Sequence, residues 1–423
     1  MKFIYTFISL LLIIFFSIDY NLFGIKDKAY KKYPNLVLGK KLFNEKSILN
    51  HLNNDHNVKF LPDTQFTKIN FEKVKLSFEK EVQSKDSKKI YSKEEEARRV
   101  FFIELIENNI WIIDFFGNFY LTNIKELNKA KNEKEILSLK NINSNFPNKS
   151  VLGSLVYKNN IYIYSSERKH DCWYMSVHVA KIDSQNLNFK NFFKSDECAK
   201  NYIEIGRMQV YVHKGTKGIL ITSSTHPAGD FSNYTDKNPQ DDNSIFGKIL
   251  FIDLNEKKSI VFSKGHRVAQ GLYVENDLII STEHGPKGGD EINKILFNKN
   301  YGWPISSYGE KYVGGYTERP YYLKDHKSHG FQEPIFVFAK SIAISEIIKL
   351  PNNFSDHFIN NFIISSLNGF SLYRVKFDEK YTKVLFFEEI FIGQRIRDIK
   401  YHNIAKTILL TLENEGEIGL LYR

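Results

Sequence analysis

Six short apolar segments recur along the chain after residue 100, and each of them ends in small or polar residues. The segments are Ile110–Asp114, Ile161–Ser166, Ile219–Ser223, Leu278–Thr282, Phe362–Ser366 and Ile408–Thr411. Continuous apolar runs of this length are typical of strands that are buried on both faces. Asn, Asp or Gly precedes several of them, as hairpin turns require. The pattern therefore predicts an all-β protein built from six similar units.

The spacing of these segments indicates which all-β fold they form. Their first residues are 51, 58, 59, 84 and 46 positions apart, which leaves room for about four strands in each unit. Repeated four-stranded units are the blades of a β-propeller, so we predict a six-bladed β-propeller over residues 98–423. A β-sandwich or two separate β domains is the alternative. The 84-residue step holds a long loop, and long loops inside compact domains are usually functional.

Residues 26–97 are rich in lysine and contain no strong series of strands, so we predict an extension or linker there. Within this stretch, residues 36–52 fit a short amphipathic helix. Residues 71–82 alternate weakly between apolar and polar side chains, as an edge strand would. We assign no function to the extension.

Residues 1–25 have the pattern of a signal peptide or a membrane anchor. An almost unbroken apolar run from Phe3 to Ile18 suits the apolar region of a signal peptide better than a full membrane span. No pair of small residues marks a cleavage site, so an uncleaved membrane anchor is the alternative. Both cases predict an exported protein, either periplasmic or anchored in the membrane and facing the periplasm. The lysines that follow the segment oppose simple export.

The two cysteines, Cys172 and Cys198, bracket a segment that predicts a β-hairpin. We expect one strand over 174–182, a turn at 183–185 and a returning strand over 187–193. Because residue 185 lies midway between the cysteines, this hairpin brings them within disulfide reach at its open end. Two unrelated thiols are the alternative. A disulfide agrees with export, because disulfides persist in oxidising compartments.

Composition excludes one class of partner and supports a large core. The 423-residue chain has a net charge of +10, but its lysines are spread along the whole length beside abundant Asn and Ile. No arginine-rich helix or base-stacking motif accompanies the charge, so we predict no nucleic-acid partner. Hydrophobic residues make up 42% of the chain and aromatic residues 15%, which is ample for a buried core.

The most informative stretch is Ser281–Pro304, which reads STEHGPKGGDEINKILFNKNYGWP. It contains a tight turn with four Gly or Pro residues, and three acids, Glu283, Asp290 and Glu291. Such turns leave backbone carbonyls free of strand pairing, and carbonyl and carboxylate oxygens are the ligands that Ca²⁺ prefers. A solvated surface turn is the alternative, because most Gly- and Pro-rich turns only connect elements.

The same string closely resembles the calcium loop of the quinoprotein sugar dehydrogenases, the soluble glucose and aldose dehydrogenases that use pyrroloquinoline quinone (PQQ). Glu-His-Gly-Pro, Gly-Asp-Glu-Ile-Asn and Asn-Tyr-Gly-Trp-Pro occur here in that family's order and spacing. The resemblance extends from about residue 148 onward and implies a six-bladed propeller that binds PQQ and Ca²⁺. It implies that the carbonyls of Gly285 and Pro286 bind one calcium, and that Glu291 and Tyr301 belong to a second calcium site.

Two further segments carry the resemblance. The Gly-His-Arg turn at 265–267, followed by Gln-Gly-Leu at 270–272, matches a turn of the family, and Arg-Ile-Arg-Asp at 395–398 matches its arginine pair. Arg395 and Arg397 alternate on a strand and therefore share one face. Two guanidinium groups on one face can bind carboxylates bidentately. The resemblance makes Arg267, Arg395 and Arg397 contacts of PQQ, while surface ion pairs are the alternative for the pair.

The catalytic base of the family is missing from its expected position. That base is a histidine in a segment that ends Gly-Arg-Leu, and the matching position here is Ile203, which cannot accept a proton. Glu204 takes its place if the alignment shifts by one residue. Asn148 and Asn368 stand where the family has a glutamine and a lysine that contact the cofactor. Three loop histidines are further candidate bases: His170, His226 and His284.

Two functions follow from these observations. The first is an exported PQQ-dependent sugar dehydrogenase, which oxidises an aldose or a related alcohol on a quinone polarised by calcium. The second is a propeller that retains the fold as a ligand-binding or structural protein with impaired catalysis. The calcium loop and the three arginines favour the first function, and the missing histidine favours the second. We take the dehydrogenase, acting on a small sugar or alcohol, as the working hypothesis.

Overall fold

A computed structural model of the protein describes residues 59–60, 69–78, 99–147, 150–170, 172–199, 203–224, 237–310, 322–355 and 358–423. The chain divides into two compact units, Met1–His51 and Leu52–Arg423, and all the described residues belong to the second unit. The predictions for residues 1–25 and for a helix at 36–52 lie outside the described residues. No helix in the described part of the chain is long and apolar enough to cross a membrane.

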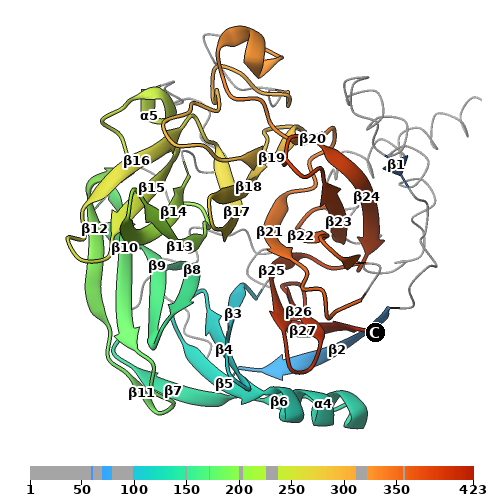
Figure 1. Cartoon of the computed structure of the whole chain (residues 1–423). Coiled ribbons are helices and arrows are strands. Elements are labelled where there is room, and N and C mark those ends of the chain that lie inside the picture. Colours follow the sequence, from blue (N-terminus) through green and yellow to red (C-terminus); the bar gives the residue numbers. More distant parts are fainter. Residues whose placement is uncertain are drawn as a thin grey trace, which may run out of the picture. The chain divides into compact units, whose positions relative to one another are not determined.

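Six sheets of four or five strands make up the second unit, and each sheet forms one blade of a propeller (Figure 1). Blade 1 comprises β3 (Phe101–Ile106), β4 (Asn109–Asp114), β5 (Phe119–Asn123), β7 (Lys140–Ser144) and β11 (Asn186–Leu187). Blade 2 comprises β8 (Ser150–Tyr157), β9 (Asn160–Lys169), β10 (Cys172–Lys181) and β12 (Lys190–Ala199). Blade 3 comprises β13 (Met208–His213), β14 (Thr216–Ser223), β15 (Lys248–Asp253) and β16 (Ser259–Lys264).

The other three blades follow in chain order. Blade 4 comprises β17 (Val268–Glu275), β18 (Leu278–His284), β19 (Asp290–Lys294) and β20 (Phe336–Phe338). Blade 5 comprises β21 (Ile344–Lys349), β22 (Phe362–Ser366), β23 (Ser371–Phe377), β24 (Val384–Phe391) and β1 (Lys59–Phe60). Blade 6 comprises β25 (Ile396–His402), β26 (Thr407–Leu412), β27 (Glu417–Tyr422), β2 (Asn70–Ser77) and β6 (Leu137–Ser138). In the described part of the chain, the helical elements are α4 (Ile124–Glu133), α5 (Lys237–Gln240) and the 3₁₀ helix η3 (His326–His329).

The first strands of the six blades form a closed inner ring. Contacts run from β3 through β8, β13, β17, β21 and β25 and back to β3. A closed ring of this kind is a propeller and excludes the β-sandwich and the two-domain alternative. The predicted six-bladed β-propeller is therefore confirmed.

Each of the six apolar segments identified in the sequence is the second strand of its blade. The strands are β4, β9, β14, β18, β22 and β26. Residues at their centres, such as Ile112, Ile221 and Leu410, are fully buried. The largest apolar cluster joins side chains from blades 1, 2 and 3, so these strands are covered on both faces by neighbouring blades. This double coverage explains why the segments are apolar at every position rather than at alternate ones.

Strand β2 closes the propeller from a part of the chain far away in sequence. It pairs antiparallel with β27 and parallel with β6, so it lies inside the sheet of blade 6 and is not the edge strand expected over 71–82. Val74 and Leu76 point into the core and are buried. Together with β1 in blade 5, the propeller therefore includes two strands from the stretch 26–97, for which the sequence predicts an extension or linker.

The predicted hairpin between the cysteines forms, but its connection is longer than expected. The first strand ends at Lys181, the returning strand begins only at Lys190, and Asn186–Leu187 between them is β11, which pairs with β7 in blade 1. Strands β10 and β12 pair antiparallel, with Tyr174 opposite Cys198. A disulfide joins Cys172 and Cys198 across the open end, and their Cα atoms are 5.6 Å apart. The bond therefore fixes the two outer strands of blade 2 to each other.

The turns of the blades lie at two ends of the strands. Turns from second to third strands, such as Gly285–Asp290 between β18 and β19, lie at one end, which we call the upper end. Connections from first to second strands lie at the opposite, lower end. The turn at 403–406 between β25 and β26 belongs to this lower end. The segments that resemble a calcium loop and a cofactor-binding arginine pair both lie at the upper end.

Candidate active site

The turn between β18 and β19 is held against blade 5 by the buried carboxylate of Asp290. Its Oδ1 accepts a hydrogen bond of 2.9 Å from the backbone N–H of Gly285. Its Oδ2 accepts bonds of 2.9 and 3.3 Å from the N–H groups of Ile342 and Ile344. Burial raises the pKa of Asp290 to about 7, although these donors and Arg267 oppose the shift. One carboxylate therefore fixes the shape of the turn that resembles a calcium loop.

Close packing explains the glycines of this turn. A Cβ at Gly285 would overlap the carbonyl oxygens of Gly288 and Gly289. Gly288 and Gly289 themselves have φ angles of 78° and 70°, which favour glycine. The hydroxyl of Ser341 accepts a 2.6 Å bond from the N–H of Gly288 and donates a 3.2 Å bond to the carbonyl of Pro286. Of the two carbonyls predicted to bind calcium, that of Pro286 therefore already accepts a hydrogen bond from the protein.

A second buried cluster lies beside the turn, around Glu283 near the end of β18. Its carboxylate accepts the backbone N–H of Arg267 and lies 3.0 Å from Nδ1 of His266. Nε2 of His266 lies 2.8 Å from Oγ of Ser263, and the ring stacks on Tyr301 with 4.6 Å between centroids. The Gly-His-Arg turn, the end of β18 and the Tyr-Gly-Trp-Pro loop therefore meet at one place.

Arg395 and Arg397 share one face, as their alternation predicts, and both contact the carboxylate of Glu413. Nε of Arg395 lies 3.0 Å from one carboxylate oxygen, and Nε of Arg397 donates to the other. Arg397 also donates a 2.6 Å bond to Oε1 of Gln270. The side chains of Arg395 and Arg397 are only 18% and 7% exposed. They are therefore not the surface ion pairs considered from the sequence, and one buried acid balances part of their charge.

Positive charge is concentrated around His284, the last residue of β18. Burial lowers the pKa of its imidazole to about 3, and the charges of Arg267, Arg397 and Arg395 act in the same direction. Arg267 donates a 3.3 Å bond to the carbonyl of His284, and its guanidinium lies 5.4 Å from the ring centre of Trp303. Nε2 of His284 is buried and has no hydrogen-bond partner among the described residues. Three arginines thus lie around a neutral ring with an unused polar atom, which suits an anionic ligand.

Glu291 and Tyr301, predicted to share a second calcium site, have separate protein partners. One oxygen of Glu291 lies 3.4 Å from Nε2 of His326, and the other accepts a 3.1 Å bond from Asn293. Burial lowers the pKa of His326, but the nearby carboxylate of Glu291 raises it above the ordinary value. The hydroxyl of Tyr301 donates a 2.6 Å bond to the carbonyl of Lys294. Within the residues that the structure describes, no group of three or more His, Cys, Asp or Glu side chains has a metal-binding arrangement.

The position expected to hold the catalytic base lies in the core. Ile203 is only 3% exposed and packs in the apolar cluster of blades 1 to 3. Glu204, its neighbour, is half-buried, and its backbone N–H donates a 2.8 Å bond to Oγ of Ser224. Asn368 donates a 2.9 Å bond to the carbonyl of Ser341 and so lies close to the Gly285–Asp290 turn.

The remaining candidate residues are one exposed histidine and two positions that the structure does not describe. His170 is exposed in the turn between β9 and β10 of blade 2. Asn148 and His226 lie outside the described residues. Of the three loop histidines proposed as substitute bases, His284 alone is placed by the described structure among the three arginines.

Arg207 was missed by the sequence analysis, although it belongs to the same Gly-Arg segment as Ile203. It pairs with Glu346 of β21, and both side chains are 4% exposed. Its Nη2 donates a 2.8 Å bond to the carbonyl of Arg397 and lies 3.6 Å from Asp398. Arg207 therefore supports the strand that presents the arginine pair. Because Glu346, Arg397 and Asp398 are at least 139 positions away from Arg207 in the chain, no local pattern could indicate them.

Comparisons with known proteins agree with this architecture. The chain matches the sequence profile of the Glucose / Sorbosone dehydrogenase family over residues 155–422. It is 30% identical to aldose sugar dehydrogenase YliI of Escherichia coli over 183 residues, which cover 40% of this chain and 45% of that protein. The chain spans less than half the length of the curated relatives it matches.

Solved structures share the fold at lower sequence identity. The soluble aldose sugar dehydrogenase of Escherichia coli, in its apo form, aligns with a TM-score of 0.61 and 17% identity over 84% of this chain and 99% of that one. The aldose sugar dehydrogenase of Streptomyces coelicolor, described as PQQ-bound, aligns with a TM-score of 0.53 and 16% identity over 77% of this chain and 94% of that one. The family profile spans most of the propeller and all the segments that form the upper-end site, so the chain belongs to the glucose/sorbosone dehydrogenase family.

Proposed function

We propose that this protein binds PQQ together with Ca²⁺ at the upper end of the propeller and oxidises an aldose or a related small alcohol. The observation that carries the proposal is the placement of Arg267, Arg395 and Arg397 around the buried His284, whose Nε2 has no hydrogen-bond partner among the described residues. Membership of the glucose/sorbosone dehydrogenase family supports it. The named relatives include a quinoprotein glucose dehydrogenase and an aldose sugar dehydrogenase.

The cationic side of the site fits an anionic quinone. PQQ carries three carboxylates, and guanidinium groups hold carboxylates through charge-assisted hydrogen bonds. Arg267 and Arg395 are the partners best placed for it, because Arg397 is already bonded to both Glu413 and Gln270. The Gly285–Asp290 turn would offer the carbonyl of Gly285 to a calcium ion. When bound, PQQ supplies a two-electron acceptor for the hydride that leaves the sugar.

The proton acceptor of the reaction does not fit the family pattern. Ile203 cannot take a proton and packs in the core. A positioned general base typically contributes 10²–10⁴-fold to a rate. We therefore expect sugar oxidation by this protein to be slower by about that factor than oxidation by a dehydrogenase that keeps the histidine.

We also propose that the protein is exported, either to the periplasm or to the periplasmic side of a membrane anchor. The apolar run from Phe3 to Ile18 supports this placement. So does the disulfide between Cys172 and Cys198, because such bonds persist in oxidising compartments. Fractionation of cells that make the native protein tests it, and recovery in the cytoplasmic fraction would contradict it.

Titration of the purified protein with PQQ and Ca²⁺, followed by the absorption spectrum of the quinone, tests the binding step. Arg395→Gln should weaken PQQ binding about 10-fold, the effect of losing one charge-assisted hydrogen bond. Arg423→Gln removes the same charge at the lower end of the strands and should leave PQQ binding unchanged. Removing Ca²⁺ with a chelator should lower both the affinity for PQQ and the melting temperature, because a ligand that binds the native state stabilises that state.

Two results would contradict the proposal. Equal PQQ affinity in Arg395→Gln and the unmodified protein would show that the assigned arginines do not hold the quinone. Binding of PQQ without any oxidation of glucose or other aldoses, measured with an artificial electron acceptor, would remove the dehydrogenase function. That second result would leave a ligand-binding propeller.

A further inference from the structure

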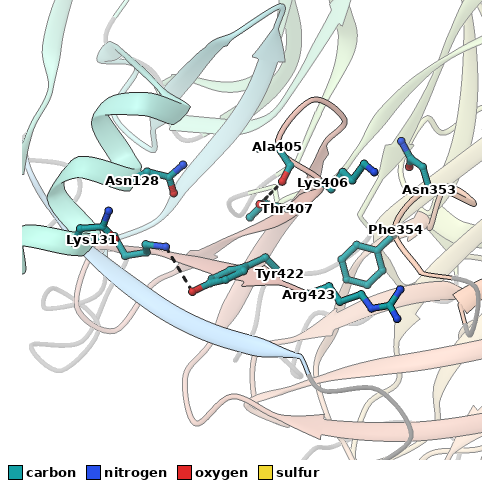
Figure 2. Close-up of a pocket in the computed structure, with 10 residues that line it drawn as sticks. Asn128, Lys131, Asn353, Phe354, Ala405, Lys406, Thr407, Tyr422 and Arg423 are labelled. Carbon is teal, nitrogen blue, oxygen red and sulfur yellow. Dashed lines mark hydrogen bonds between the residues drawn. The ribbon is translucent and has the colours of Figure 1, made fainter.

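A cavity of about 640 Å³ lies at the lower ends of the strands in blade 6 (Figure 2). Its walls come from helix α4, the connection between β21 and β22, the turn between β25 and β26, and the end of β27. The Gly285–Asp290 turn and Glu413 lie at the upper ends of their strands. The length of the strands therefore separates this cavity from the candidate active site. Its volume is in the range of small-molecule sites.

The lining of this cavity is basic. Lys131, Lys406 and Arg423 contribute positive charge, and none of the lining residues is acidic. Lys131 is balanced from outside the cavity by Glu72, 3.1 Å from its Nζ. Its Nζ also lies 3.5 Å from the hydroxyl of Tyr422, a contact marked in Figure 2. Lys406 and Arg423 are exposed and form no ion pair with any residue that the structure describes. Two cations therefore face the cavity without acidic partners, which favours an anionic ligand.

Amide and aromatic groups complete the lining. Asn128, Lys131 and Asn132 line the cavity from α4, where Asn128 lies three and four residues before the other two. Within the described part of the chain, neither amide side chain has a hydrogen-bond partner. The ring of Phe354 is fixed in the opposite wall, where it packs edge-on against Tyr401 with 5.9 Å between centroids. Amides with unused donors and acceptors bind hydroxyl groups, and aromatic faces cover apolar C–H surfaces.

We propose that this cavity binds an acidic saccharide, that is, a sugar ring that carries a phosphate or a carboxylate group. Lys406 and Arg423 hold the anionic group, because they are the cations without acidic partners. Asn128 and Asn132 hydrogen-bond to the sugar hydroxyls, and the buried Phe354 forms the apolar part of the wall. The site uses none of the arginines of the candidate active site, so it does not depend on PQQ binding.

Isothermal titration calorimetry on the full chain tests this proposal with glucose 6-phosphate, glucuronate, glucose and inorganic phosphate. One equivalent of at least one of the two acidic sugars should bind, and more tightly than either glucose or inorganic phosphate. Lys406→Gln and Arg423→Gln should each weaken that binding about 10-fold. Lys258→Gln removes the same charge from an exposed lysine between β15 and β16 and should have no effect.

The remaining outcomes each overturn the proposal. If neither acidic sugar binds, the cavity is not a saccharide site. If inorganic phosphate binds as tightly as glucose 6-phosphate, the cavity is a simple anion site and the saccharide assignment fails. If Arg395→Gln weakens binding while Lys406→Gln does not, the acidic sugar occupies the upper end. Melting curves of the variants exclude unfolding as the cause, since Lys406 and Arg423 are exposed side chains.

Discussion

Lys248 shows at the scale of one residue how burial changes the chemistry of a side chain in this propeller. It lies in β15 and is fully buried. Its Nζ donates bonds of 3.2 and 2.9 Å to the carbonyls of Pro239 and Phe246. Burial lowers the pKa of its ammonium group from 10.5 to about 8, although the charge of Glu197 opposes the shift. The folded protein therefore releases this proton at a lower pH than the unfolded chain does.

The stability of the protein should consequently depend on pH through Lys248. Between pH 8 and 10.5 the unfolded state binds more protons at this residue than the folded state, so the contribution of Lys248 to stability rises with pH. The slope reaches at most about 1.4 kcal/mol per pH unit. Urea unfolding at several pH values from about 7.5 to 9.5 should show a rise in the unmodified protein relative to Lys248→Met. Parallel curves for the two proteins would contradict the prediction, and the exposed-site variant Lys258→Met should follow the unmodified protein.

Single residues of the candidate site could be predicted from sequence only where a local motif carries them. Arg267 and the pair at 395 and 397 stand in recognisable short strings, and the structure brings them together around His284. Glu413, which contacts the arginine pair, stands in no such string. Its position beside the pair follows from the register of the β25–β26 hairpin, in which Ile396 pairs with Leu412. The burial of Ile203 also depends on neighbouring blades. The role of Glu413 and the burial of Ile203 therefore depend on packing between distant segments, which local sequence patterns do not reveal.

At the scale of elements, local sequence patterns predict the central strands of the blades but not the strand that closes the propeller. The second strand of every blade is recognisable because both of its faces are buried and apolar. Strand β2 alternates only weakly, with a burial pattern in which Val74 and Leu76 alone are buried. Its partners are far away, as the 3.0 Å ion pair between Lys73 and Glu417 across 344 positions illustrates. A strand that completes a sheet from the opposite end of the chain therefore leaves little signal in a local window.

The hairpin of blade 2 gives a prediction at the same scale. The disulfide closes a loop with a sequence separation of 26 between Cys172 and Cys198. A crosslink of that length restricts the unfolded chain and stabilises the fold by about 3 kcal/mol. The double variant Cys172→Ser/Cys198→Ser should lose about that much in urea unfolding, and Cys198→Ser alone should lose nearly as much. Unchanged unfolding midpoints would mean that the crosslink does not limit the unfolded state.

At the scale of the whole molecule, buried charges join the blades around the inner ring. Arg207, Glu346 and Asp398, which belong to blades 3, 5 and 6, lie in contact. Oδ2 of Asp398 also accepts a 2.9 Å bond from the backbone N–H of Ile103 in blade 1. Glu104 of blade 1 lies 3.5 Å from Lys400 of blade 6. Burial raises the pKa of Glu346, while the charge of Arg207 opposes that shift. Each charge in this set is therefore tolerated only because another blade supplies its partner.

This arrangement predicts strong coupling between Arg207 and Glu346. Arg207→Met leaves the carboxylate of Glu346 buried without its partner, and Glu346→Leu leaves the guanidinium of Arg207 buried without its partner. Either change should lower the free energy of unfolding by about 3–5 kcal/mol. The double variant should cost much less than the sum, because it removes both charges together. The buried pair Arg374–Glu388, 2.7 Å apart within blade 5, is the matched control. Because Arg207 also donates to the carbonyl of Arg397, Arg207→Met should weaken PQQ binding, whereas Arg374→Met should leave it unchanged. Additive losses in urea unfolding would show that Arg207 and Glu346 are not coupled. Equal effects of Arg207→Met and Arg374→Met on PQQ affinity would show that the buried charges do not support the upper-end site.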